Sequence, residues 1–288
     1  MKISACTFIR NAVRFDYPIV ESINSILPII DEYVVLVGKS EDNTLELIQS
    51  IKSEKIRIIE SDWDENLNSN GEILANETNK ALTHISKDTD WIFYLQGDEV
   101  VHEKNHEEIL RSCKENLSNQ NVEGLLFNFI HFYGDYDHYG DSRKWYRNEI
   151  RIIRNNAKIK SYKDAQGFRI DNRKLNVKKV DADIYHYGWV KEPTIQLERL
   201  KNSQNYWQND QWELSNQDSL EFEYDQMPYL VKFEGSHPRV MDKRIKAKGW
   251  VFEYNSKHTK VSFRRRLLQF IEKLIGWRIG EYKNYRII

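Results

Sequence analysis

The stretch that most constrains the fold is residues 91–99, with the sequence WIFYLQGDE. Its first five residues are apolar or aromatic without interruption, which is typical of a strand buried on both faces in the middle of a parallel sheet. The run ends at Gln96 and Gly97, and two carboxylates, Asp98 and Glu99, follow at once. Because ligands of open α/β sheets bind outside the carboxyl ends of the strands, these acids stand where a site is expected. The alternative is that they only cap the next turn.

Strand and helix patterns alternate on both sides of this stretch. Strands are predicted at residues 3–9, 33–37, 55–60, 91–95, 124–131, 149–153 and 180–187. Helices are predicted from Pro18 and at residues 44–51, 72–85 and 105–117. The alternation predicts an α/β fold with a mostly parallel central sheet between helices. From about Pro193 the pattern becomes helical and polar, which predicts a C-terminal helical extension.

Length and charge narrow the class of protein. The 288 residues suffice for one large domain or two modest ones. Since 43 Lys and Arg face 44 Asp and Glu, no nucleic-acid partner is expected. The cysteines, Cys6 and Cys113, match no zinc or redox spacing, and residues 1–9 do not resemble a signal peptide. No apolar run reaches the ~20 residues that span a bilayer. We therefore expect a cytoplasmic protein.

The order of these features resembles the nucleotide-binding half of family 2 glycosyltransferases, which have the GT-A fold. The resemblance rests on the first strand, the loop at 35–44, the helix that contains Asn79 and the acids that end the stretch at 94–99. Further stretches resemble a bacterial branch of that family: residues 91–103, 145–155, 161–169 and 184–191.

The resemblance covers roughly residues 1–195 and implies both an architecture and an activity. A Rossmann-like GT-A domain would comprise a nucleotide-binding half at about 1–125 and an acceptor half at about 126–195, with a mainly helical extension at 196–288. The implied activity moves a sugar from a nucleotide-sugar donor to a glycan or lipid-linked acceptor, with inversion, in the biosynthesis of a bacterial surface polysaccharide.

The family's Asp-x-Asp motif falls on Gln96, Gly97 and Asp98, so an amide replaces the first acid. A departing diphosphate develops negative charge, which a divalent metal held by carboxylates commonly neutralises. The resemblance implies that Asp98 is the principal ligand of Mg²⁺ or Mn²⁺, with Glu99 assisting it or only holding the loop. By the resemblance His186 would touch the metal or the diphosphate; taken alone, a histidine among aromatics is more often a core residue. One acid fewer implies weaker metal binding.

Other donor contacts follow from the same resemblance. The implied nucleotide-sugar residues are Phe8, Arg10, Asn11, Gly38, Asp42, Asn79, Gln96, Gly97 and Asp98. Many family members carry paired acids where this chain has Val37 and Gly38, and one of those acids usually contacts the base. Base recognition must therefore be rearranged. The alternative for this loop is a plain turn that leads into the helix at Thr44.

An inverting transferase also needs a general base for the acceptor hydroxyl. By position, Asp164 resembles the family's acid near the acceptor, and Glu149 is the second candidate. Either acid could instead be a structural partner of an arginine. The candidates for stacking on sugar faces are Trp145, Tyr146 and Trp189.

Two other functions stay open. The acids missing at Gln96 and at 37–38 would suit a nucleotide- or sugar-binding protein without catalysis. The sequence His102-Glu103-x-x-His106 matches the pattern of zinc peptidases. Against it, Asn105 resembles a helix N-cap with Glu108 in a capping box, which places His102 outside the helix and spoils the spacing of the two histidines.

The C-terminal tail is basic and amphipathic. Residues 257–286 hold nine Lys or Arg and two Glu. On a helical projection one arc is apolar, formed by Phe263, Leu267, Leu268, Phe270, Ile271, Leu274, Ile275 and Trp277. A helix at 261–279 of this kind can lie on an anionic membrane surface, which would place the protein at the inner face of the cell membrane. The alternative is a C-terminal helix docked on the catalytic domain.

Overall fold

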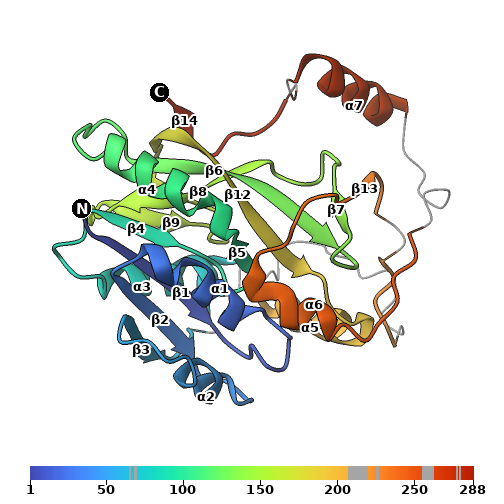
Figure 1. Ribbon diagram of the computed structural model, residues 1–288, viewed down its shortest axis with the longest axis horizontal. Helices are drawn as coiled ribbons and strands as arrows, with labels where there is room; N and C mark the ends of the chain where they lie inside the picture. Colours follow the sequence, from blue (N-terminus) through green and yellow to red (C-terminus); the bar gives the residue numbers. More distant parts are fainter. Residues whose placement is uncertain are drawn as a thin grey trace.

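The computed structural model describes residues 1–64, 66–67, 70–206, 220–224, 227–254, 263–276, 278 and 280–288. Its centre is a twisted sheet in the order β3-β2-β1-β4-β8-β6, with β12 beside β6 (Figure 1). These strands are β1 (Ile3–Ile9), β2 (Glu32–Gly38), β3 (Ile56–Ser61), β4 (Trp91–Tyr94), β6 (Gly124–Tyr133), β8 (Asn148–Arg154) and β12 (Asn176–Trp189). All run in one direction except β8, which is antiparallel to both neighbours.

Helices cover both faces of this sheet. One face packs against α1 (Ile19–Ile26), α2 (Thr44–Gln49) and α4 (His106–Glu115). The other packs against α3 (Glu72–Thr83) and a small antiparallel sheet of β9 (Ile159–Tyr162), β10 (Gly167–Ile170) and β11 (Arg173–Lys174). The predicted α/β class, with a parallel-rich sheet between helices, is confirmed, and it is the GT-A-type arrangement that the resemblance implies.

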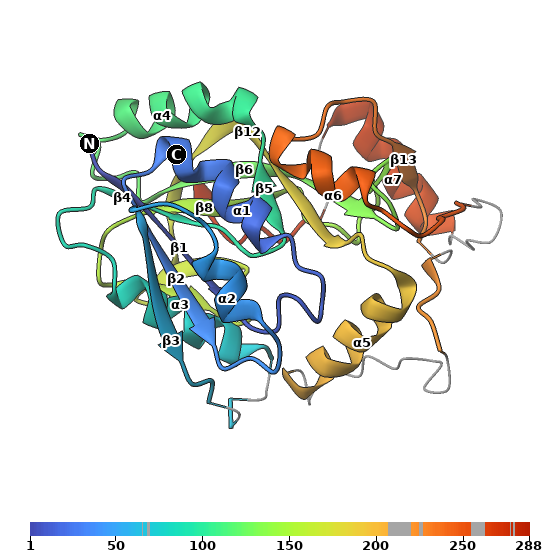
Figure 2. The same ribbon diagram turned by 60° about the horizontal axis from the view of Figure 1, so that its bottom comes forward.

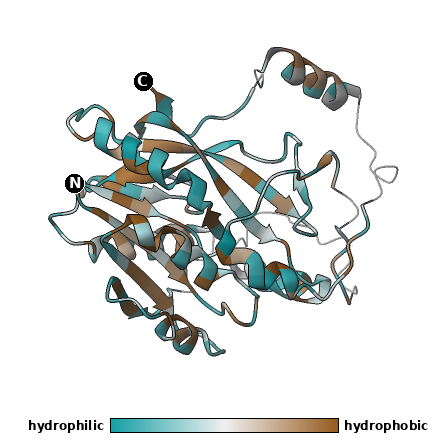
Figure 3. Cartoon of the chain, viewed as in Figure 1, coloured by the Kyte–Doolittle hydropathy of each residue, from teal (hydrophilic) through white to brown (hydrophobic). Residues whose placement is uncertain are grey.

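The opening stretch forms the predicted strand. Side chains of β4 alternate between the two cores, because Trp91 and Phe93 pack toward α1 and α4 while Ile92 and Tyr94 pack toward α3. All four are buried, and burying a large apolar side chain stabilises the fold by about 1.5–3 kcal/mol. Hydrophobic residues concentrate in the same way along the neighbouring strands (Figure 3). Burial on both faces explains the uninterrupted apolar run.

The other predicted elements occur within a few residues of their expected bounds. The prediction did not separate several short strands, namely β5 (Glu99–Val101), β7 (His138–Gly140), β9, β10, β11, β13 (Leu230–Lys232) and β14 (Arg286–Ile287). Short 3₁₀ helices also occur at η1 (Leu27–Ile29), η2 (Glu103–Asn105), η3 (Gln204–Tyr206) and η5 (Arg239–Met241). The capping box was wrong: Asn105 precedes α4, but its side chain donates to the carbonyl of Asp183 instead of capping the helix.

The C-terminal extension contains α5 (Pro193–Ser203), α6 (Asp242–Lys246) and α7 (Phe263–Ile275). It also returns two strands to the sheet, because β13 pairs with β7 and β14 pairs with β12. Figure 2 shows α5 at the end of the molecule toward which β1, β2 and β3 point. Of the helices that the structure describes, none has the length and apolar content needed to cross a membrane.

Candidate active site

Asp98 and His186 meet because β5 and β12 pair. The antiparallel register places His186 opposite Glu99, and the backbone N–H of Tyr187 donates to the carbonyl of Asp98 at 2.8 Å. As a result, Oδ2 of Asp98 lies 3.6 Å from Nε2 of His186, with 14% and 12% of the two side chains exposed. Gly188 completes this corner: a Cβ there would lie 2.5 Å from Oδ2 of Asp98 and 2.8 Å from Nε2 of His186. Only a residue without a side chain leaves this space open.

Nearby cations keep Asp98 ionised. Burial by itself raises the pKa of this carboxyl group. The charges of His186, Lys191 and Arg199 together outweigh burial and hold the pKa of Asp98 well below its usual value. The group is therefore a carboxylate throughout the neutral range and can serve as an oxygen ligand.

His131, which was not predicted, fixes the orientation of His186. Its Nε2 lies 2.8 Å from the carbonyl oxygen of Tyr146, and its Nδ1 lies 3.1 Å from Nδ1 of His186. Burial, followed by the charge of His186, lowers the pKa of His131 well below its usual value, so this ring is neutral. Since a carbonyl only accepts, Nε2 of His131 carries the proton and Nδ1 accepts from His186. Nε2 of His186 is the nitrogen turned toward Asp98.

The residues present can give a divalent ion two protein ligands, the carboxylate of Asp98 and Nε2 of His186. Within the described ranges no group of three or more His, Cys, Asp or Glu side chains is arranged to hold a metal. Mg²⁺ commonly takes one or two protein carboxylates and fills its remaining positions with substrate phosphates and water. The pair fits a metal that is bound together with a phosphate ligand.

The other residues of the motif hold the loop. Glu99 receives two hydrogen bonds from Arg151, at 2.6 and 2.5 Å, and both side chains are buried. Of the two roles left open for Glu99, the structure supports the structural one. Gln96 donates to the hydroxyl of Tyr94 at 3.2 Å and contacts the carbonyl of Ala165 at 3.5 Å. The amide that replaces an acid therefore links the end of β4 to the β9–β10 turn.

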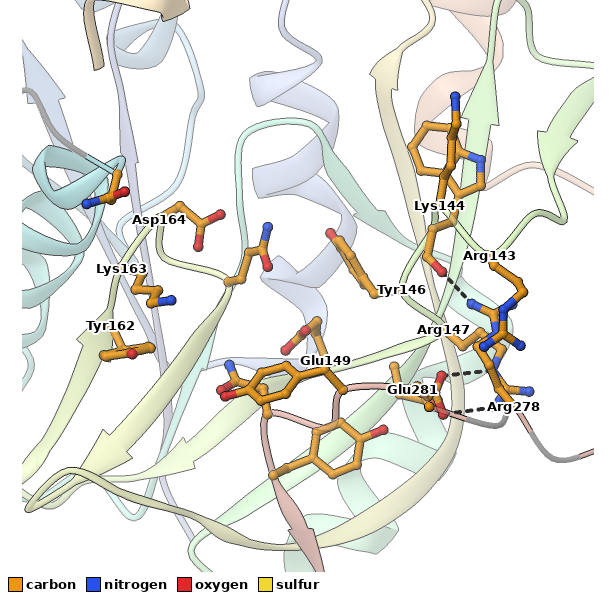
Figure 4. A pocket seen from close by; sticks show the side chains of 18 residues that line it. Arg143, Lys144, Tyr146, Arg147, Glu149, Tyr162, Lys163, Asp164, Arg278 and Glu281 are labelled. Atoms are coloured by element: carbon orange, nitrogen blue, oxygen red, sulfur yellow. Dashed lines mark hydrogen bonds and ion pairs between the residues drawn. The ribbon is translucent and has the colours of Figure 1, made fainter. Parts of the chain in front are cut away.

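That turn carries Asp164 at the wall of a pocket of about 640 Å³ (Figure 4). Lys163 and Ala165, on either side of Asp164, have φ values of 54° and 61°, in the left-handed region that non-glycine residues rarely occupy. Strain of this kind persists only where the surroundings impose it, and it is frequent at functional sites. Burial raises the pKa of Asp164 despite hydrogen bonds from its own backbone N–H and that of Gln166.

Glu149 lines the same pocket, and its environment keeps it protonated. Burial, with repulsion from Asp164 and Glu99, outweighs the attraction of Arg151 and raises the pKa of Glu149 to about 8. Its Oε2 atom is buried without a hydrogen-bond partner among the described residues. At neutral pH the pocket therefore combines a neutral acid, Glu149, with a second carboxyl group, Asp164.

Tyr146 separates this pocket from the Asp98 corner. Its ring lines the pocket, and its carbonyl accepts from His131. Burial raises the pKa of its hydroxyl well above the usual value, and the charges of Glu99 and Asp98 add to that shift. Of the other predicted acceptor residues, Trp145 also lines the pocket, whereas Trp189 lies outside it and stacks on Tyr133 with centroids 5.8 Å apart.

Trp63, which was also not predicted, gathers three of the proposed nucleotide residues. Its ring lies 5.8 Å from that of Phe8 and 5.6 Å from the guanidinium carbon of Arg10. It packs directly on Gly38, where a Cβ would collide with the indole. Tyr206 contacts the other side at 5.7 Å. A lone tryptophan in the polar segment at 62–70 was the available sequence signal.

Three other predicted donor residues are engaged in holding loops together. Asn11 accepts from the backbone N–H of Glu41 at 2.8 Å. Asp42 accepts from the backbone N–H groups of Arg14 and Thr44, at 2.7 and 3.0 Å. Asn79 accepts from the backbone N–H of Ser161 at 2.8 Å. Gly97 packs against Ile9, whose Cδ1 would lie 2.9 Å from a Cβ. These residues shape the site without presenting these oxygens to a ligand.

The two histidines of the peptidase-like pattern do not form a metal pair. His102 lies outside α4, as predicted: it precedes η2 in an extended conformation, and its Nε2 bonds to the hydroxyl of Ser236 at 2.9 Å. Nε2 of His106 bonds to the carbonyl of Ser25 at 2.8 Å. Each imidazole therefore has a structural partner of its own.

No protein-family model matches the sequence, and no curated protein matches it either. Among solved structures the chain is similar to S. aureus TarS, with a TM-score of 0.41 and 16% identity over 70% of this chain and 39% of that one. It is also similar to the 4-diphosphocytidyl-2C-methyl-D-erythritol synthase of Anaerococcus prevotii, with a TM-score of 0.39 and 13% identity over 71% of this chain and 95% of that one.

A third similar structure is glucosyl-3-phosphoglycerate synthase from Mycobacterium tuberculosis in complex with Mn²⁺, UDP and phosphoglyceric acid. Its TM-score is 0.30, with 17% identity over 45% of this chain and 43% of that one. The chain thus spans less than two thirds of the TarS chain and of this synthase. At TM-scores of this size, any assignment of activity depends on the geometry of the site.

Proposed function

We propose that this chain is a glycosyltransferase that moves a sugar from a nucleotide-sugar donor to a hydroxyl group of a glycan or lipid-linked acceptor. The observation that carries the proposal is the position of Tyr146. This residue borders the pocket of Asp164 and Glu149 on one side and, through His131, the Asp98–His186 corner on the other. A donor diphosphate at Asp98 and an acceptor in the pocket would then be neighbours.

The groups on the acceptor side suit a single displacement. Asp164 takes the proton of the acceptor hydroxyl while that oxygen attacks the anomeric carbon. The bond from this carbon to the diphosphate oxygen breaks, its electron pair leaves with the diphosphate, and the configuration inverts. Glu149 is neutral at pH 7, so it is the poorer base, and Asp164 keeps the first place. Trp145 and Tyr146 provide the aromatic faces on which sugars stack.

On the donor side, Asp98 and His186 are the ligands that would hold Mg²⁺ or Mn²⁺, which supplies positive charge for the diphosphate. Phe8, Arg10 and Gly38, gathered around Trp63, are the proposed contacts for the nucleoside. We keep the division that the resemblance implies, with the nucleotide half at about 1–125, the acceptor half at about 126–195 and the extension at 196–288. We place the enzyme in the cytoplasm, in the biosynthesis of a bacterial surface polysaccharide.

The test is transfer from nucleotide sugars. The purified full-length chain is incubated with a panel of uridine, guanosine, cytidine and thymidine diphosphate sugars, with and without Mn²⁺, and released nucleoside diphosphate is measured. We expect one donor to be consumed and Asp98→Asn to lose that activity while melting at the wild-type temperature. Unchanged turnover by Asp98→Asn would refute the assignment of the donor site.

The second candidate is a nucleotide- or sugar-binding protein without catalysis. The observation that favours it is that the side chains of Glu99, Asp42 and Asn79 are all engaged in structural hydrogen bonds. Asp98 is then the one acid of the motif that is available to a ligand. Calorimetry with nucleotides, combined with the transfer assay, separates the two functions. If a nucleotide binds but the protein releases no nucleoside diphosphate with any acceptor, the binding protein is favoured.

We also propose that α7 attaches the enzyme to an anionic lipid surface. The helix contacts the rest of the chain through polar residues: among its described side chains Gln269 and Glu272 are buried, Gln269 donates to the carbonyl of Asp141 and Glu272 accepts from Arg143. Leu267, Phe270 and Leu274 face outward, with 47%, 60% and 67% of their surfaces exposed. Basic residues on the same helix would add attraction to anionic headgroups. The rest of the predicted segment at 261–279, including Trp277, lies partly outside the described residues.

A further inference from the structure

The C-terminal end of the chain forms one wall of the pocket that holds Asp164 and Glu149. The pairing of β14 with β12 returns the chain to the sheet. Before this strand and at its start, the pocket is lined by Arg278, Gly280, Glu281, Tyr282, Asn284 and Tyr285. Figure 4 shows Glu281 on the side of this segment, and Tyr162, Lys163 and Asp164 on the side of the β9–β10 turn. The C-terminal extension is therefore part of the pocket.

Two arginines from other parts of the chain hold this wall in place. Nε and Nη2 of Arg147 donate to the two carboxylate oxygens of Glu281 at 3.1 and 3.0 Å. Nη1 of the buried Arg169 donates to the backbone carbonyl of Asn284 at 3.0 Å. Because these contacts exist before a ligand binds, the wall is preorganised, and a ligand loses little free energy to ordering it.

Tyr282 presents an exposed aromatic ring on this wall. The residue lines the pocket, and 74% of its surface is exposed. Its hydroxyl accepts a hydrogen bond from Nη2 of Arg169 at 3.2 Å, and Nζ of Lys174 lies 4.8 Å from its ring centroid. These two contacts orient the ring and leave most of it accessible.

Tyr162, at the end of β9, presents a second exposed ring in the same pocket. Of its surface 37% is exposed, and the guanidinium carbon of Arg169 lies 4.7 Å from its ring centroid. Nζ of Lys163, whose side chain is exposed, lies 5.5 Å from the same centroid. One exposed aromatic residue is ordinary in a folded protein. Two exposed rings that line one pocket and contact the same buried arginine form a fixed pair of surfaces.

Asn284 adds a buried hydrogen-bonding group to the same pocket. Its Oδ1 is buried without a partner among the described residues, as is Oε2 of Glu149. Gly167 lies next to both side chains, because a Cβ there would collide with the amide nitrogen of Asn284 and lie 3.6 Å from Oε2 of Glu149. Buried polar atoms without partners are costly, so the pair indicates a ligand that forms hydrogen bonds. Buried polar groups together with exposed aromatic faces suit a sugar chain.

We propose that Tyr282 and Tyr162 form a stacking subsite for a second sugar of the acceptor, next to the sugar whose hydroxyl group reacts at Asp164. This inference rests on the proposed glycosyltransferase function and deepens it. The pocket volume of about 640 Å³ exceeds that of a single hexose, and Trp145 and Tyr146 already provide faces for the reacting sugar. The acceptor is then a chain of at least two sugars, and the C-terminal extension selects for it.

Free sugars of increasing length are the probe, because they test acceptor binding without a donor. Saturation-transfer NMR with the full-length protein would compare the methyl glycosides of glucose, galactose, mannose and N-acetylglucosamine with those of the corresponding di- and trisaccharides. The variants are Tyr282→Ala, Tyr162→Ala and the ring-preserving Tyr282→Phe. Lys283→Ala is the matched control, because Lys283 is exposed on the same segment and does not line the pocket.

We expect wild type to bind at least one oligosaccharide more tightly than the matching monosaccharide. Tyr282→Ala and Tyr162→Ala should each weaken binding of that oligosaccharide by about 5- to 10-fold and leave binding of the monosaccharide unchanged. Tyr282→Phe and Lys283→Ala should bind both sugars as wild type does.

The substituted side chains are exposed, and melting curves check that each variant is folded. Equal oligosaccharide affinity of Tyr282→Ala and wild type overturns the stacking subsite. So does an equal loss of monosaccharide binding in that variant, or a wild type that prefers no oligosaccharide of the panel.

The stacking subsite and the transferase can fail separately. Oligosaccharide binding that depends on Tyr282, in a protein that consumes no nucleotide sugar, leaves the subsite and removes the proposed function. Sugar transfer with the same acceptor KM in Tyr282→Ala and wild type leaves the function and removes the subsite.

Discussion

The Nδ1 atoms of His131 and His186 lie 3.1 Å apart, and because Nδ1 of His186 donates to Nδ1 of His131, this hydrogen bond orients the ring of His186. Removing His131 should therefore weaken metal binding, because His186 loses the partner that orients its ring, although His131 itself is not a proposed metal ligand. We expect His131→Phe to weaken Mn²⁺ binding by about 10- to 100-fold, the usual effect of losing a partner behind a metal-binding histidine. The measurement is a Mn²⁺ titration of activity or of bound metal.

His102→Gln is the control for this prediction, because that histidine bonds to Ser236 and belongs to no proposed metal pair. A His131→Phe protein that folds and binds Mn²⁺ as tightly as wild type would show that His131 does not support His186.

Gly188 provides a steric test of the same corner. The methyl group of Gly188→Ala would lie 2.5 Å from Oδ2 of Asp98, so the carboxylate or the backbone must shift. We expect donor turnover to fall by at least about tenfold, since small displacements of catalytic groups are costly. Gly249→Ala is the matched control, because no atom lies within 4 Å of its Cβ. Equal kinetics for the two variants would argue against a site at Asp98.

Asp164 is tested by removing its charge alone. Asp164→Asn keeps the shape of the side chain but cannot accept a proton, so turnover should fall by about 10²- to 10⁴-fold while donor affinity stays unchanged. Asp171→Asn, an exposed acid that ends the same hairpin, is the control. Steady-state kinetics and calorimetry separate the two effects. An Asp164→Asn enzyme with wild-type turnover would exclude this residue as the base.

Glu149 predicts a pH dependence of stability. Its pKa in the folded protein is about 8, above the ordinary value of 4.5, so the folded state holds a proton that the unfolded state releases between these values. The stabilisation is complete below pH 4.5 and is lost as pH rises to about 8, at a slope of at most about 1.4 kcal/mol per pH unit. Glu149→Gln cannot release a proton and lacks this loss.

Urea unfolding at pH 5, 6.5 and 8 measures the free energy of unfolding of wild type and of Glu149→Gln, and the contribution of Glu149 is the difference between the two. We expect wild type to lose stability relative to Glu149→Gln as pH rises. Parallel stabilities across the three pH values would mean that Glu149 titrates normally.

The helices and strands that could be predicted from the sequence are those whose own residues show a clear hydrophobic pattern. The strand at Trp91 and its helical neighbours carry their own periodicity, so their bounds agree with the structure to within a few residues. The strands β5 and β14 have only three and two residues. They form because they pair with β12, and this long-range pairing leaves no hydrophobic pattern in their own residues. The capping box failed for the same reason, since Asn105 is engaged by the carbonyl of Asp183 on β12.

The site was predictable only where the family resemblance supplied it. Asp98, in the turn before β5, and His186, on β12, lie far apart in sequence, and the resemblance alone joined them. His131 could not be predicted, because a single histidine in an aromatic strand has no distinguishing pattern. Its role follows from its burial and from its contact with His186, which the sequence does not show.

The orientation of α7 leads to a prediction about membranes. Leu267, Phe270 and Leu274 lie outward, while Glu272 is buried and pairs with Arg278 at 2.8 Å. These three apolar side chains thus face away from the body of the protein, as those of an interfacial helix do. We expect the full-length protein to float with vesicles containing anionic phospholipid, less so in high salt, and replacement of all three apolar residues by Gln to abolish flotation. Gln at the exposed residues Leu220 and Val251 is the control. Equal flotation of the triple variant and wild type, or none by wild type, would refute the membrane role.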